Sequence, residues 1–154
     1  MKPYHLFLSL IVAVLATIGT CSNAHAEWVI EGGKFEEVTI NEAVCGYYSG
    51  GYAALTDRHM NYGETAKQLQ DGATRGAVRT MTNTDQYASF SLLWTDAPSI
   101  PEIASNPNIR KLAQMRTQTI ADVLQQFSRE ECMKRLGEVI EVPKRVWRKP
   151  GVQM

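Results

Sequence analysis

Cysteine and histidine offer the most chemistry in this chain, and both are scarce. The sequence has three cysteines and three histidines, but Cys21 and two of the histidines fall within the first 26 residues, which have the pattern of an export signal. Beyond that segment, Cys45, Cys132 and His59 remain. They are too few for a four-ligand zinc site, so we predict neither a metal nor a cofactor. Two cysteines in an exported domain favour a disulfide between Cys45 and Cys132.

Catalysis by His59 is the main enzymatic alternative. A histidine acts as a general base when it contacts a nucleophile and a third group orients its ring. Asp57 is two residues away, so on a helix the two side chains point to different sides. The chain has no G-x-S-x-G, P-loop, H-E-x-x-H or C-x-x-C motif. We therefore expect no catalytic residues, and a small hydrolase that uses His59 is the less favoured hypothesis.

Residues 1–26 have the three parts of a secretory signal peptide. Lys2 gives a positive start, and the apolar segment 6–18 is too short to span a membrane. Ala24-His25-Ala26 then forms a cleavage site before Glu27. The sequence thus predicts a periplasmic or secreted protein that begins at Glu27.

A lipid anchor on Cys21 is the alternative fate of this segment. Bacterial lipoproteins are cut before a lipid-modified cysteine, and glycine or alanine usually precedes it. Thr20 stands at that position here. A chain anchored through Cys21 would be an envelope lipoprotein or scaffold component.

Charge and length narrow the class of protein. The chain has 16 basic and 16 acidic residues, and loss of Lys2 with the signal leaves a net charge of about −1. This balance does not favour a nucleic-acid binder, and the polar residues of the later segments exclude a membrane span after residue 26. We expect a single helical domain over 27–143 and a basic C-terminal tail over 144–154.

Helices are expected to position both cysteines. Residues 39–60 predict one helix, which begins with a capping box of Thr39 and Glu42 and carries Cys45 one turn later. Cys132 belongs to a late helical segment, so the bridge would enclose most of the domain. In the chain-entropy account a loop of this length is worth roughly 4 kcal/mol.

The helix over 39–60 combines glycines with tyrosines. Gly46 and Gly50 are four residues apart and share a face, although each glycine costs up to about 1 kcal/mol in a helix. We expect this face to pack closely on another helix, with Gly72 and Gly76 as its counterpart, or else to form a groove for a ligand or partner. With the aromatic and basic end of the chain, these residues give a candidate binding surface: Gly46, Tyr47, Tyr48, Gly50, Tyr52, Trp147 and Arg148.

Apolar spacing and cap residues predict the other elements. Helices are expected over 64–81, over 83–94 with an apolar side of Tyr87, Phe90, Leu93 and Trp94, and over 107–127. The last of these either bends and restarts at Ser128 or runs unbroken to 136. The segment 96–107 contains three prolines and is predicted to be a loop with one helical turn near Pro101. Residues 27–38 look extended around a turn at Gly32-Gly33, and Val139, Ile140 and Val142 could pair with Trp28–Ile30.

These elements define a mainly α protein. We expect a four to five helix bundle closed by one disulfide, with a short two-stranded β piece joining the N- and C-terminal segments. This layout resembles small periplasmic immunity proteins, which block amidase toxins, and periplasmic chaperones. The resemblance implies a non-enzymatic protein that works by binding another protein in the periplasm.

Overall fold

The computed structural model describes residues 27–80 and 83–148, with side chains at 31–75 and 83–146. Ile30–Val146 form one compact unit, and the description below concerns that unit. The helices and strands of the described residues follow in the order β1 (Glu27–Thr39), α2 (Glu42–Tyr62), α3 (Ala66–Thr80), α4 (Thr84–Asp96), the 3-10 helix η2 (Ala97–Ser99), α5 (Ile100–Ser105), α6 (Pro107–Arg116), α7 (Ile120–Met133) and β2 (Val139–Arg148).

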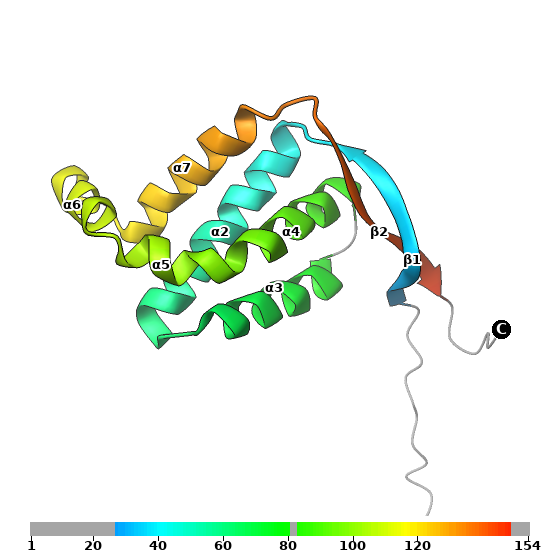
Figure 1. Ribbon diagram of the computed structural model, residues 1–154, viewed down its shortest axis with the longest axis horizontal. Helices are drawn as coiled ribbons and strands as arrows, with labels where there is room; N and C mark the ends of the chain where they lie inside the picture. The colour runs from blue at the N-terminus through cyan, green and yellow to red at the C-terminus, as the bar shows by residue number, and fades with distance from the viewer. Residues whose placement is uncertain (1–26, 81–82, 149–154) are drawn as a thin grey trace, which may run out of the picture. The chain divides into compact units, whose positions relative to one another are not determined.

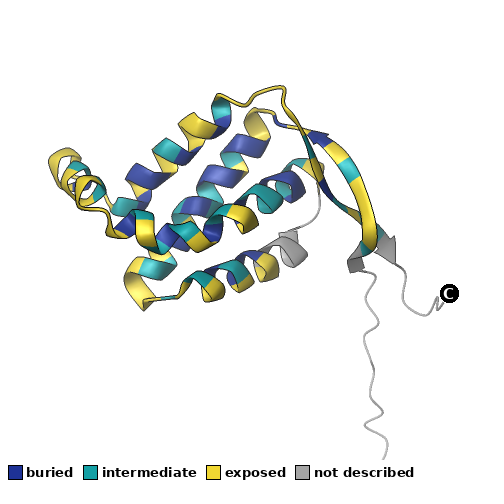
Figure 2. Ribbon diagram, viewed as in Figure 1, coloured by how far each residue is buried: buried dark blue, intermediate teal, exposed yellow. Residues whose placement is uncertain are grey.

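Helix α2 lies at the centre of the unit. It packs most extensively on α7 and α4, while α3 packs on the far side of α4, so α7, α2, α4 and α3 lie side by side (Figure 1). The faces that they turn toward one another are buried (Figure 2). The largest fully buried side chains include Ile40, Val44, Leu69, Tyr87, Ile100, Val123 and Val142.

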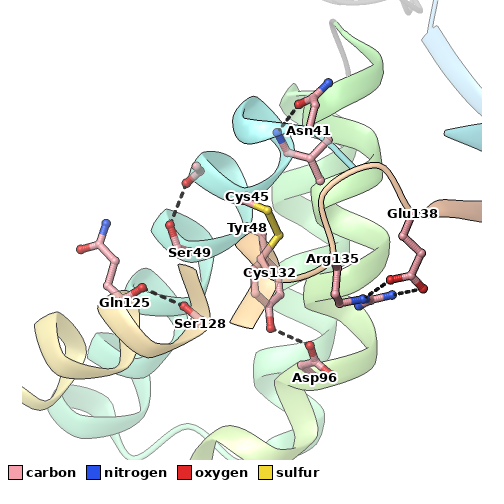
Figure 3. Close-up of a disulfide and its surroundings, with 12 residues drawn as sticks. Asn41, Cys45, Tyr48, Ser49, Asp96, Gln125, Ser128, Cys132, Arg135 and Glu138 are labelled. Atoms are coloured by element: carbon pink, nitrogen blue, oxygen red, sulfur yellow. Dashed lines mark hydrogen bonds and ion pairs between the residues drawn. A yellow bond between two sulfur atoms is a disulfide. The ribbon is translucent and has the colours of Figure 1, made fainter. Parts of the chain in front are cut away.

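The predicted disulfide and fold class are confirmed. Cys45 of α2 and Cys132 of α7 are bonded, with their Cα atoms 5.5 Å apart and a sequence separation of 87 positions. Figure 3 shows the bridge between the two helices. The unit is mainly helical, and a two-stranded antiparallel sheet joins its N- and C-terminal segments. Within the residues described, no helix is long and apolar enough to cross a membrane.

The start of α2 corrects the predicted capping box. Thr39 ends strand β1, and Asn41 is the cap, because its side-chain oxygen accepts from the Val44 N–H at 2.9 Å. The helix ends at Tyr62, and Gly63 caps it in the left-handed region with a φ of 67°, a conformation that suits glycine.

The segment 96–107 was predicted as a loop with one helical turn near Pro101. That turn is confirmed as part of α5, but the residues before it are helical as well. The segment forms η2 and α5, since Pro98 and Pro101 each stand within the first two helical positions. A proline there removes an N–H that has no helical partner.

The predicted helix over 107–127 is divided at a different place from Ser128. Helix α6 ends at Arg116, and Thr117 follows in the left-handed region with a φ of 54°. Thr119 then caps α7 with a capping box to Asp122. Helix α7 runs through Ser128, whose hydroxyl donates to the Gln125 carbonyl inside the helix.

The strands pair in a register different from the predicted one. The Ile40 N–H donates to the Glu138 carbonyl at 2.8 Å, and the Gly137 N–H donates to the Ile40 carbonyl at 2.9 Å. In an antiparallel pair, the residues that follow Glu138 therefore lie beside those that precede Ile40. Val139, Ile140 and Val142 thus lie beside the C-terminal half of β1 and not beside Trp28–Ile30. Strand β1 is continuous through Gly32-Gly33, and β2 continues past residue 143, where the tail was predicted to begin.

The predicted close packing of another helix on the face of Gly46 and Gly50 is wrong. A Cβ added at Gly46 or Gly50 would meet no atom within 4 Å, so these positions face open space. The close approaches occur elsewhere. A Cβ at Gly51 would lie 2.7 Å from Leu93 Cδ2, and a Cβ at Gly72 would lie 2.2 Å from Arg58 Nη1.

Candidate functional site

The three tyrosines of the predicted binding surface do not share one exposed face of α2. Tyr47 is 45% exposed, whereas Tyr48 and Tyr52 are buried on the side of α2 that faces the core. The side chains of Trp147 and Arg148 lie outside the part of the chain with described side chains. The tyrosines therefore divide into one exposed ring and two rings that pack inside the unit.

Tyr48 lies beside the disulfide and points toward Asp96. The Tyr48 hydroxyl donates to Asp96 Oδ2 at 2.7 Å (Figure 3). The Tyr48 ring meets that of Tyr52 edge to face, with the ring centres 5.9 Å apart. Burial raises the pKa of Tyr48, and the hydrogen bond and negative charge of Asp96 raise it further. Burial also raises the pKa of Tyr52, although a hydrogen bond with Ser99 acts in the opposite direction. Both hydroxyls stay protonated at neutral pH, and the Tyr48 hydroxyl tethers α2 to the end of α4 through Asp96.

A small hollow lies against this pair. Its volume is about 290 Å³, and residues of α2, α4, η2, α5, α6 and α7 line it. The hollow gives Tyr48 and Tyr52 limited contact with the surface.

His59 of α2 contacts the turn that follows its own helix. Its Nδ1 lies 2.9 Å from the Glu64 carbonyl oxygen, so Nδ1 carries the proton and donates. Arg58 donates from Nε and Nη2 to Glu64 Oε1, at 3.0 and 2.7 Å. These contacts fix the turn from α2 to α3, so Arg58 and His59 both have a structural role.

A larger groove, which sequence reasoning did not predict, lies between α4 and β2. Its volume is about 670 Å³. We call it the α4–β2 groove, and the described residues that line it are Thr74 of α3, Tyr87, Phe90, Ser91, Leu92, Trp94 and Thr95 of α4, and Ile140, Glu141 and Pro143 of β2. Its walls are mainly apolar, and Trp94 is 47% exposed.

Tyr87 joins the two sides of the groove. It is 1% exposed, and its hydroxyl donates to the Pro143 carbonyl at 2.5 Å. The Arg145 guanidinium lies 4.8 Å from the centre of the Tyr87 ring and 3.9 Å from a carboxylate oxygen of Glu36. Burial raises the pKa of Tyr87, Glu36 adds to the rise, and Arg145 opposes it. These contacts hold β2 against α4 and so fix the two sides of the groove relative to each other.

The sequence predicted the α4 wall of this groove in part. Tyr87, Phe90, Leu93 and Trp94 were predicted as the apolar side of one helix. Only Tyr87 and Leu93 are buried, at 1% and 9% exposed, because β2 and α2 cover the side of α4 on which they lie. Periodicity marks an apolar stripe, but it does not show which part of the stripe another element will cover.

No protein-family model matches the chain, and no curated protein or solved structure matches it. In the part of the chain described, no group of three or more His, Cys, Asp and Glu residues could hold a metal ion.

Proposed function

We propose that this chain is a non-enzymatic exported protein that acts by binding another protein, as an inhibitor of the immunity type or a factor of the chaperone type. The observation that supports this proposal is the α4–β2 groove, an apolar concave surface with a half-exposed tryptophan. Soluble proteins keep large aromatic side chains in such a position at interfaces, where tryptophan is enriched among the residues that dominate binding energy.

The construction of the groove supports binding better than catalysis. The Tyr87–Pro143 hydrogen bond fixes one wall of the groove against the other. A wall that is already in place lowers the ordering cost when a partner binds. The His59 ring, in contrast, is engaged with the Glu64 carbonyl at 2.9 Å.

Export remains part of the proposal. A signal peptide over 1–26 would deliver the chain to the periplasm or the exterior, where Cys45 and Cys132 can oxidise. The mass of the mature N-terminus tests this step. A chain that begins at Glu27 supports cleavage by signal peptidase, whereas a lipid on Cys21 would support an envelope lipoprotein.

Partner capture with a matched pair of variants tests the binding function. The oxidised protein and its Trp94→Ser and Met115→Ser variants are immobilised and exposed to periplasmic extract. Met115 is 73% exposed on α6 and does not line the α4–β2 groove, so it controls for loss of an exposed apolar side chain. We expect one partner to be retained by the wild type and by Met115→Ser and lost by Trp94→Ser. Repeated absence of a partner, or equal retention by both variants, contradicts the proposal.

A further inference from the structure

Strand β2 has one edge that β1 does not use. Among the described residues the sheet has two strands, so β2 pairs on one side only. The Glu138 carbonyl accepts from the Ile40 N–H and thus points toward β1. Successive residues of a strand direct their backbone groups to alternate edges, so those of 139, 141 and 143 point away from β1.

Pro143 confirms this alternation independently. Its carbonyl accepts from the Tyr87 hydroxyl of α4, so it points away from β1 and toward the helix. Proline has no N–H to donate, and sheets place it where the N–H of that residue would face away from a partner strand. The edge of β2 that points away from β1 is therefore the edge that faces α4.

Glu141 lies two residues before Pro143 on this same edge and lines the α4–β2 groove. Its N–H and carbonyl are directed like those of Pro143, but unlike Pro143 it has an N–H to donate. Backbone groups of this kind are satisfied by water or by another backbone. Beside them stand Phe90 and Trp94, whose side chains line the same groove.

We propose that the α4–β2 groove binds an extended segment of the partner protein, which adds to β2 as a third strand at Glu141. This inference rests on the proposed binding function and specifies its mode. The backbone of the segment pairs with the N–H and carbonyl of Glu141, and its alternate apolar side chains contact Phe90 and Trp94. An extended segment fits better than a helix because a helix satisfies its own backbone groups and would leave this edge unused.

Only a short part of β2 can pair with the partner segment, because both ends of the free edge are limited. At one end, Pro143 offers no N–H and its carbonyl is already bound by Tyr87. At the other end, the chain turns at Gly137, which has a φ of 84°. The free edge between these limits suits a segment of a few residues, so most of the specificity falls to the side chains that enter the groove.

A pair of substitutions at Glu141 tests the mode of binding. Glu141→Pro removes the N–H from the free edge and places a ring there, while Glu141→Ala keeps the N–H. Proline is already accepted on this edge at position 143, so both variants should fold, and equal thermal midpoints with an intact disulfide verify that they do. The probe is a fluorescein-labelled peptide, Lys-Thr-Val-Thr-Val-Thr-Val-Lys, and the readout is fluorescence anisotropy. A second peptide with proline at the central valine controls for strand formation by the probe.

We expect the wild type and Glu141→Ala to bind the first peptide, and Glu141→Pro to bind it about tenfold more weakly or worse. If Glu141→Pro binds as the wild type does while Trp94→Ser loses the peptide, the groove binds side chains without strand addition, and the inference is overturned while the binding function stands. If the wild type binds neither peptide, strand addition is overturned, and the capture experiment alone decides the binding function. If the wild type is a dimer that Glu141→Pro converts to a monomer, a second copy occupies the edge, and a partner segment is excluded.

Discussion

The Tyr87 hydroxyl donates a hydrogen bond to the carbonyl of Pro143, a residue 56 positions later in the chain. It joins helix α4 to strand β2 at the end of the α4–β2 groove. The tyrosine ring is buried at 1% exposure, with the Arg145 guanidinium over its face. One side chain thus connects the helical body with the sheet and fixes the strand edge that we propose as the partner's docking site.

Removal of this hydroxyl should loosen β2 on α4. Tyr87→Phe keeps the ring but leaves the Pro143 carbonyl without its donor, and a lost buried hydrogen bond costs about 1–2 kcal/mol. We expect the free energy of unfolding, measured by urea titration, to fall by that amount. Tyr47→Phe is the control because Tyr47 is 45% exposed on α2. Equal stability of the two variants would show that the Tyr87 hydroxyl does not hold the strand.

The disulfide should supply a large part of the stability of the unit. A bridge between residues 87 positions apart restricts the unfolded chain, and bridges of this kind typically contribute about 2–4 kcal/mol. We expect the double variant Cys45→Ala/Cys132→Ala to unfold at a lower denaturant concentration by a corresponding amount. Thiol titration of the native wild type provides the control, since it should detect no reactive Cys45 or Cys132. Two free thiols would contradict the fold itself.

Alkaline pH should weaken the fold through Tyr48. Burial, followed by the hydrogen bond to Asp96, raises the pKa of Tyr48 in the folded state above the usual value of about 10. The folded protein therefore keeps a proton that the unfolded chain loses. The resulting contribution to stability is complete below about pH 10 and declines as the pH rises above that value.

Unfolding midpoints from pH 7 to pH 11 check the role of Tyr48. Tyr48→Phe should be less stable at neutral pH, because Asp96 loses its donor, and its stability should fall less steeply above about pH 10. Tyr62→Phe is the control because Tyr62 is 80% exposed. If the alkaline slopes of wild type and Tyr48→Phe coincide, the titration of Tyr48 is not linked to folding.

The parts of the fold that local sequence determines were predictable. The bridge was predicted because Cys45 and Cys132 are the only cysteines that follow the expected signal peptide. The spacing of apolar residues predicted the helices that the structure shows as α3 and α4. Cap residues were harder to choose, since Thr39 and Asn41 both suit a helix start. Asn41 is the cap because Thr39 is needed in β1, and only the pairing of β1 with distant β2 reveals that need.

The candidate site depended on contacts between distant segments and was not predictable. Trp94 and Leu93 are neighbours in one apolar stripe, but Leu93 is 9% exposed beneath α2 and Trp94 is 47% exposed in the groove. The edge of β2 at Glu141 faces the groove because the Tyr87 hydroxyl binds the Pro143 carbonyl and holds that edge toward α4. No local pattern contains these relationships, since each one joins elements far apart in the sequence.

Adjacent glycines of α2 should respond in opposite ways to the same substitution. Gly50 faces open space, so Gly50→Ala adds a methyl group without a clash and removes the helix cost of glycine. We expect Gly50→Ala to raise the free energy of unfolding by about 0.5–1 kcal/mol. Gly51→Ala would place its Cβ 2.7 Å from Leu93 Cδ2, where α2 packs on α4.

Gly51→Ala should therefore lower the free energy of unfolding, because overpacking a buried contact costs about 1–3 kcal/mol, which exceeds the gain from replacing a helical glycine. Thermal and urea unfolding of Gly50→Ala, Gly51→Ala and the wild type measure the difference directly. If both substitutions stabilise the protein equally, Leu93 moves without cost and the close approach of α4 to α2 at Gly51 is not a constraint. If Gly50→Ala destabilises it, the open face of α2 is covered in solution, and that face becomes a second surface at which to look for the partner.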